Sequence, residues 1–435
     1  MQPSQINRAL GPTENIYFLL DKLYCLNFVV FAEIDGPFDS ARLASALQAV
    51  QAEHPLLRAR VALVGGRPWF KPVSARTHPI QIALGALRNW RLQIAAELDR
   101  PFVDEAPRAR FLLLGGSGRK SVAAMVFHHS IADGRSGVDV FIEVLQRSAG
   151  QNMPLSFRQA RPSAQDLDLI KLKGPVGASI KKLAYWLNQS KSALKFAQQL
   201  PGFDATARPE RNVKVVSFSF QKKKAQALLA ACRAHGTTMQ GALGAAQVLA
   251  INDEFGSARA RTLGLNSLAD LRGVLGGGLT ERDLGLYIAT VTTVHAIPAK
   301  PDLWMLAADI ASQLKAILNS GDANLVHTIH REGALFPPNE VGARMVQALV
   351  ALAPPSSMLT NVGKFDPIVL GNGARVRSLA FLVSPPAQHP ICVTAATFAQ
   401  VVHLNLLYDQ RKIEATQAQR IAKSMAEFMQ LAAES

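Results

Sequence analysis

The residues of this chain with the clearest chemical potential are two adjacent histidines, His128 and His129, followed closely by Asp133 and Gly134. Imidazole titrates near neutral pH, so a single well-placed histidine can act as general base for a hydroxyl, an amine or a thiol. Neighbouring residues of a strand point to opposite faces, so these two rings cannot easily bind one metal ion. We therefore expect no metal here and a different role for each histidine.

The flanking sequence predicts the elements that must position these side chains. Apolar runs at Phe111–Leu114 and Val122–Phe127, separated by a turn rich in glycine, predict the two strands of a hairpin. Apolar residues at helical spacing after the turn predict a helix just beyond it. One histidine ring would face an open channel while the other packs inward. Asp133 is too near in the chain to stand behind His129 in a triad, so we expect it to anchor the turn by pairing with a distant cation.

The run from His128 to Gly134 resembles the HHxxxDG signature of the thioester-dependent acyltransferase superfamily. Its members include chloramphenicol acetyltransferase, carnitine acyltransferases, plant BAHD acyltransferases, condensation domains of peptide synthetases and Pap-type polyketide-associated acyltransferases. The resemblance implies that His129 is the catalytic base. It also implies that Asp133 is structural and is held by an arginine from the other half of the molecule. His128, which we place inward, and Gly134 are the other structural residues expected at this site.

Other stretches extend the resemblance over nearly the whole chain, most closely to Pap-type enzymes and free-standing condensation domains. Residues 36–58 resemble the opening of these proteins, with a helix expected from Ser40. The Asp-x-Arg segment ending at Arg272 resembles a Pap-type segment and makes Arg272 the candidate partner of the motif aspartate. Thr360 and Asn361 resemble the Ser/Thr-Asn-x-Gly strand end of the same enzymes. Their donors are candidates for stabilising an oxyanion or lining the acceptor site. The Asp-Phe-Gly-Trp-Gly motif of plant BAHD enzymes is absent from the sequence.

The composition is that of a large folded protein. Of the 435 residues, 49% are hydrophobic and 18% are charged, which excludes a disordered chain. Cys25, Cys232 and Cys392 are far apart, so we expect a reducing compartment and neither a disulfide framework nor a zinc site. No apolar run reaches the roughly 18 residues of a membrane helix, and the first residues do not resemble a signal peptide. We expect the protein to be cytoplasmic.

The positive charge is concentrated in the middle of the chain. The formal net charge is +15, and residues 158–224 contain fourteen Lys and Arg against four Asp and Glu. A basic face suits an acidic protein, a phosphate-bearing ligand or an anionic membrane, although a solvated surface is an equal alternative. No nucleic-acid partner is expected, since no nucleic-acid-binding motif accompanies the charge. The basic helix predicted here either packs on its own domain or makes a peripheral membrane contact; its lysines are Lys181, Lys182, Lys191 and Lys195.

The order of strand and helix patterns predicts a mixed α/β (α+β) protein. We expect an N-terminal lobe at residues 1–155 that carries the histidine motif, a basic connecting segment at 156–209, and a C-terminal lobe at 210–435. The resemblance implies two chloramphenicol-acetyltransferase-like lobes that form a pseudo-dimer with a central channel. The polar stretch from Arg8 to Asn15 is expected to form turns.

With the resemblance, these features predict an acyltransferase of lipid, polyketide or other secondary-metabolite biosynthesis. It would move an acyl group from acyl-CoA or an acyl carrier protein to the hydroxyl of a small-molecule or lipid acceptor. The thioester donor is a substrate, so no permanently bound cofactor is expected. A free-standing condensation enzyme that forms an amide is an alternative, since it differs only in the acceptor. A non-catalytic scaffold that binds carrier proteins is a third alternative, which the intact His129 disfavours.

Overall fold

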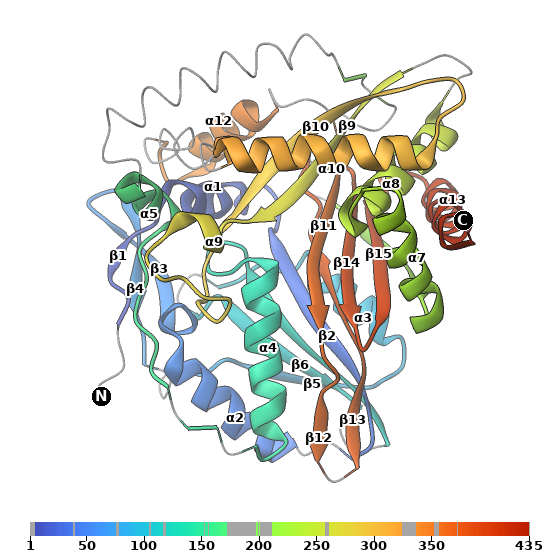
Figure 1. Ribbon diagram of the computed structural model, residues 1–435. Coiled ribbons are helices and arrows are strands. Elements are labelled where there is room, and N and C mark those ends of the chain that lie inside the picture. Colours follow the sequence, from blue (N-terminus) through green and yellow to red (C-terminus); the bar gives the residue numbers. More distant parts are fainter. Residues whose placement is uncertain are drawn as a thin grey trace.

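The protein is built on two six-stranded sheets, with helices packed on them (Figure 1). The computed structural model describes residues 5–37, 40–74, 78–103, 106–115, 119–151, 153–154, 156–171, 197–198, 200, 211–256, 261–323, 336–351, 356–371 and 373–434. Within these ranges, no helix combines the length and the apolar character needed to cross a bilayer. The four lysines of the predicted basic helix lie outside the described residues.

The first sheet carries the histidine pair and has the strand order β12-β13-β2-β7-β6-β5. Its strands are β12 (Val369–Gly371), β13 (Ala374–Val383), β2 (Asn27–Asp35), β7 (Lys120–His128), β6 (Ala109–Leu114) and β5 (Ile82–Gly85). β6 and β7 are antiparallel neighbours, which confirms the predicted hairpin. Helices α2 (Ser40–Glu53) and α4 (Gly134–Ser148) pack against each other, and α4 also packs on β2 and β7. The core of this lobe therefore surrounds the strand that ends at the motif.

The sheets do not follow the predicted linear division into residues 1–155 and 210–435. Strands β12 and β13 come from the C-terminal part of the chain, yet they complete the first sheet. β13 pairs with β2 from Val383 opposite Phe28 to Arg375 opposite Asp35. An unpaired apolar edge strand is a liability, and β13 protects the edge of β2. Local sequence does not encode which sheet a strand joins, so only the tertiary structure places β13 beside β2.

The second sheet has the order β10-β9-β11-β14-β15-β8. Its strands are β10 (Ile288–Ile297), β9 (Arg261–Asp270), β11 (Ser356–Phe365), β14 (Ile391–Phe398), β15 (Val401–Asp409) and β8 (Val213–Phe220). The helices packed around it are α7 (Lys222–Ala234), α8 (Met239–Phe255), α10 (Leu303–Ser320) and α13 (Ala415–Glu434). Residues 241–251 of α8 are all buried, so this part of the helix is enclosed on every side.

The N-terminal residues form regular structure, so the prediction of turns at Arg8 to Asn15 is wrong. Strand β1 (Arg8–Ala9) joins a small sheet with β4 (Arg67–Pro72) and β3 (Ala59–Val64), and helix α1 (Pro12–Leu20) follows. Proline at the first position and Glu14, which accepts a hydrogen bond from the Gly11 amide, start α1. The remaining short elements are η1 (Pro55–Arg58), α3 (Trp90–Ala96), α5 (Ala164–Lys171), α9 (Arg272–Leu275) and α12 (Glu340–Val350).

Candidate active site

The histidine pair lies at the end of a central strand, as the sequence predicts. His128 is the last residue of β7 and pairs with Asn27 of β2. The amide of His129 donates a hydrogen bond to the carbonyl of Leu26 at 3.1 Å, so pairing with the β2 segment continues one residue beyond the strand. Helix α4 begins at Gly134. The rings are therefore mounted between a central strand and a helix start, which are both rigid.

The ring of His128 points inward and is fully buried. Its Nδ1 lies 2.7 Å from Ser130 Oγ, and its Nε2 lies 3.3 Å from a carboxylate oxygen of Asp21, just after α1. Burial alone would raise the pKa of Asp21, but His128, the Leu26 amide and Arg108 together outweigh burial, and the pKa is lowered. His128 therefore ties the end of β7 to the N-terminal helix.

The ring of His129 is held between two aromatic rings. Its centroid lies 5.1 Å from that of Tyr17 on α1 and 4.9 Å from that of Phe28 on β2. Burial and the nearby His128 lower the pKa of His129 to about 4, although the Ala132 carbonyl acts in the opposite direction. A neutral imidazole at physiological pH has a free lone pair and is able to accept a proton.

Asp133 anchors the turn between the histidines and α4, and it is fully buried. It is the N-cap of α4, where its side chain accepts a hydrogen bond from the Ser136 amide at 2.9 Å. It also accepts from Arg272 Nη2 at 2.9 Å and from the Tyr287 amide at 3.0 Å. Its own amide donates to the Gly285 carbonyl at 2.9 Å. The pair expected between Asp133 and Arg272 is therefore present, and it joins the motif to the second half of the chain.

Gly134 occupies a tight position, where an added Cβ would require its neighbours to shift by a few tenths of an ångström. A Cβ at this residue would lie 3.0 Å from Cγ1 of Val362 and 3.5 Å from the ring of Phe381. Val362 belongs to β11 and Phe381 to β13, so the start of α4 touches strands of both sheets. A glycine after the aspartate lets these elements approach closely.

Arg135 is a site residue that the sequence analysis missed. Its guanidinium donates to the carbonyl of Val362 at 3.1 Å and to Glu281 at 2.6 Å, and it lies 4.7 Å from the ring centre of Phe365. It also pairs with Asp139 on α4 at 3.3 Å. A cation in the first turn of a helix is unfavourable unless other groups compensate its charge. The position of Arg135 directly after the Asp-Gly pair was therefore the sequence signal that it has distant partners. Arg135 is a second bridge between the motif helix and the second half of the chain.

Thr360 and Asn361 line a cavity of about 170 Å³ beside the start of α4. The lining also includes Gly134, Arg135, Leu268, Asp270, Glu281, Ile288, Val362 and Gly363. The two candidates do not end a strand as expected, because β11 continues past a register shift to Phe365. Asn361 Oδ1 accepts a hydrogen bond from the Gly363 amide at 3.0 Å. The structure brings both residues to the motif helix, but His129 is not among the residues that line this cavity.

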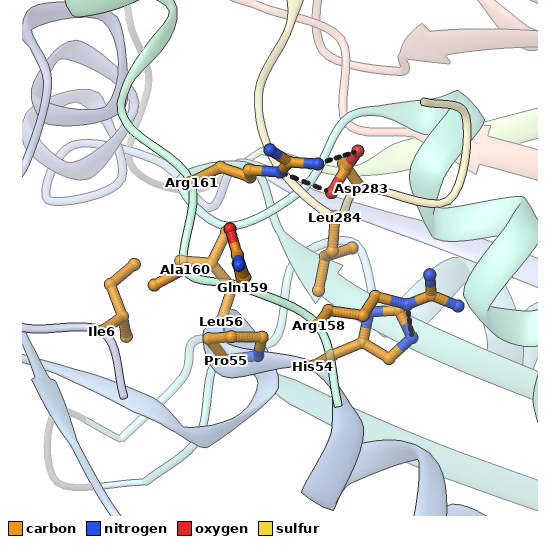
Figure 2. A pocket seen from close by; sticks show the side chains of 10 residues that line it. All are labelled: Ile6, His54, Pro55, Leu56, Arg158, Gln159, Ala160, Arg161, Asp283 and Leu284. Carbon is orange, nitrogen blue, oxygen red and sulfur yellow. Dashed lines mark hydrogen bonds and ion pairs between the residues drawn. The ribbon is translucent and has the colours of Figure 1, made fainter. Parts of the chain in front are cut away.

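A second, much smaller cavity of about 10 Å³ lies at the start of the connecting segment (Figure 2). Its lining combines residues 158–161 of that segment with residues 54–56 of the first half and Asp283 and Leu284 of the second half. Arg161 forms an ion pair with Asp283 at 2.9 Å, and Arg158 Nε lies 3.3 Å from Nε2 of His54. The backbone carbonyl of Asp283 accepts a hydrogen bond from Arg272 at 3.3 Å. The start of the connecting segment is therefore bonded to both halves, and this contact supports the arginine that holds the motif.

Breaking the Asp133–Arg272 pair should destabilise the fold. Removing one partner of a buried pair leaves an uncompensated charge and costs about 3–5 kcal/mol. We expect Asp133→Ala and Arg272→Ala each to lower the free energy of unfolding by this order, with strong coupling in a double-mutant cycle. Chemical denaturation measures both effects. The exposed Arg344–Glu340 pair on α12 is a matched control, for which less than about 1 kcal/mol is expected. Independent effects at Asp133 and Arg272 would contradict this prediction.

Comparison with known proteins identifies the family. The condensation-domain family matches residues 20–325. The structure is similar to polyketide synthase associated protein 5 from Mycobacterium tuberculosis, with a TM-score of 0.73 and 15% identity over 99% of this chain and 100% of that one. It is also similar to the trichothecene 15-O-acetyltransferase of Fusarium sporotrichioides, with a TM-score of 0.74 and 14% identity over 98% of this chain and 95% of that one.

The epimerization domain from the third module of tyrocidine synthetase B has a TM-score of 0.71 and 16% identity, over 100% of this chain and 99% of that domain. No curated protein sequence matches the chain significantly. These structural similarities confirm the mixed α/β fold with two chloramphenicol-acetyltransferase-like lobes. Since the family match spans well over half of the chain, the protein belongs to the condensation-domain family.

Proposed function

We propose that this protein is an acyltransferase that moves an acyl group from a thioester to an acceptor hydroxyl. The observation that carries the proposal is the neutral, firmly held His129 just beyond the end of β7, in a motif turn that Asp133 ties to the second half of the chain. A general base must be unprotonated and must be held still, and this arrangement meets both requirements. The membership of the condensation-domain family fits a role in acyl transfer or condensation.

The reaction balances with His129 as the one proton carrier. The imidazole accepts the proton of the acceptor hydroxyl while the oxygen forms a bond to the thioester carbonyl carbon. The resulting tetrahedral intermediate carries negative charge on the former carbonyl oxygen. When this intermediate collapses, the carbon–sulfur bond breaks and the imidazolium returns its proton to the thiolate. The cavity lined by Thr360 and Asn361 adjoins the motif helix, and we propose that it receives part of the acceptor.

The two histidines should respond differently to substitution. His129→Ala should lower kcat by roughly two to four orders of magnitude and leave the protein folded, since it removes the base. His128→Ala should instead lower the free energy of unfolding by about 1–3 kcal/mol, because it leaves buried polar partners unpaired. Intact-mass detection of the acylated acceptor, with a panel of CoA and carrier-protein donors and with hydroxyl and amine acceptors, measures the rates. An unchanged rate in His129→Ala would sink the mechanism, and faster transfer to amines would favour a condensation enzyme.

The rate should resist mild acid. Because burial lowers the pKa of His129 to about 4, the ring stays neutral as the pH falls from 8 to about 5. We expect kcat/KM to be nearly flat over that range and to fall as the pH approaches 4. A rate profile measured together with circular dichroism separates this loss from acid unfolding. An acid limb centred near the ordinary histidine pKa of about 6.5 would contradict the environment described for the ring.

The basic segment offers a test of the donor. Acyl carrier proteins are typically acidic, so a broad basic surface should speed their association, whereas a CoA phosphate needs only a few nearby cations. We propose that reversing four lysines slows transfer from a carrier protein far more than from acyl-CoA: Lys181, Lys182, Lys191 and Lys195. The defect should shrink as salt rises, because screening acts over about 8–10 Å.

A control variant separates this effect from the change in total charge. It makes the same number of reversals at four exposed residues outside the basic stretch: Lys300, Lys315, Arg344 and Lys423. Stopped-flow association at several salt concentrations should show a larger defect for the segment variant. Equal losses for both donors would assign the lysines to CoA phosphates or to the fold. No loss for either donor would contradict a role in donor binding and would direct attention to binding of anionic vesicles.

A further inference from the structure

Helix α1 supports both motif histidines from one face. Tyr17 lies against the ring of His129, and Asp21, four residues later, pairs with His128. Residues four apart on a helix are neighbours on its surface. The placement of α1 against β7 therefore determines the Tyr17–His129 and Asp21–His128 contacts together. The helix is itself anchored, because Arg8 donates two hydrogen bonds to Glu14, at 2.6 and 2.7 Å. Tyr17 is therefore placed as firmly as the catalytic turn.

The hydroxyl of Tyr17 is free to donate a hydrogen bond. The side chain is partly buried, and no group in the described part of the chain is hydrogen-bonded to this hydroxyl. The hydroxyl is not among the fully buried polar atoms that lack a partner, so a bound substrate can reach it. Burial, together with the nearby Tyr24 and Asp133, raises the pKa of Tyr17 to about 12. The phenol thus keeps its proton at neutral pH, and its O–H group has no acceptor among the residues that the structure describes.

We propose that the Tyr17 hydroxyl donates a hydrogen bond to the negatively charged oxygen of the tetrahedral intermediate. This inference rests on the acyl transfer proposed above. The intermediate forms at a carbon within reach of His129, and Tyr17 is in ring contact with His129. The cavity lined by Thr360 and Asn361, in contrast, does not include His129. The phenol keeps its proton throughout and stabilises the charge as a fixed dipole, so the proton balance of the reaction is unchanged.

The test compares two substitutions of the same residue. Tyr17→Phe removes only the hydroxyl, and Tyr17→Leu removes the ring as well. If the hydroxyl donates to the intermediate, both variants should lower kcat by tenfold or more, up to roughly the 10²–10³-fold effect of a lost oxyanion donor, and the KM for the acceptor should change little. Tyr408→Phe, at a buried tyrosine on β15, is a matched control with kcat expected to be unchanged. Thermal unfolding of each variant confirms that it is folded.

The possible outcomes separate this inference from the proposed function. A loss of rate in Tyr17→Phe, with the pH profile of the wild type, supports the hydroxyl as donor. A full rate in Tyr17→Phe with a loss only in Tyr17→Leu overturns it and leaves Tyr17 as a packing partner of the imidazole. If Tyr17→Leu does not fold, Tyr17→Phe decides alone. A wild-type protein that transfers no acyl group from any donor overturns both the proposed function and this inference, whereas active wild type with full-rate Tyr17→Phe overturns only the latter.

Discussion

The buried carboxylate of Asp133 is the interaction on which the rest of this site depends. A carboxylate without solvent is strongly unfavourable unless donors surround it. Here it is satisfied by the start of its own helix, by Arg272 and by the Tyr287 amide. Two of these three donors belong to the second half of the chain. Supplying hydrogen-bond donors to Asp133 thus brings the two halves together at the motif. The same contacts set the position of His129, four residues earlier in the chain.

Buried charge across the two halves contributes geometry more than net stability. The cost of removing charges from water can equal their mutual attraction, so replacing such pairs by apolar groups is often neutral or stabilising. Apolar packing, however, would allow α4 to slide over β11, whereas directed hydrogen bonds from Arg135 and Arg272 do not. The Arg161–Asp283 pair extends the same restraint to the connecting segment. We interpret these ion pairs as the means by which two lobes hold one reaction centre in register.

Aromatic packing sets the environment of His129, the proposed base. His129 has a fixed ring position because Tyr17 and Phe28 lie against it, and the same burial keeps the ring neutral. A more exposed imidazole would be a stronger base but would be partly protonated near neutral pH. The site thus combines an imidazole of low pKa, the proposed base, with a rigid mount. In such a site, catalysis must come largely from stabilising the charge that develops on the substrate, which is why hydrogen-bond donors beside His129 matter.

The sequence by itself determined the features that local pattern or motif spacing encodes. Two apolar runs separated by a glycine-rich turn predicted β6 and β7, the HHxxxDG motif placed His129 and Asp133, and the resemblance singled out Arg272. Tertiary structure alone decided the contacts between distant residues that no periodicity records. Tyr17 meets His129 because α1 is folded back over the end of β7, and β13 joins β2 although more than 300 residues separate them. Arg135 likewise meets Glu281 and the Val362 carbonyl only in the folded protein. Its positive charge is unfavourable at the start of α4, and these groups of the second lobe compensate it.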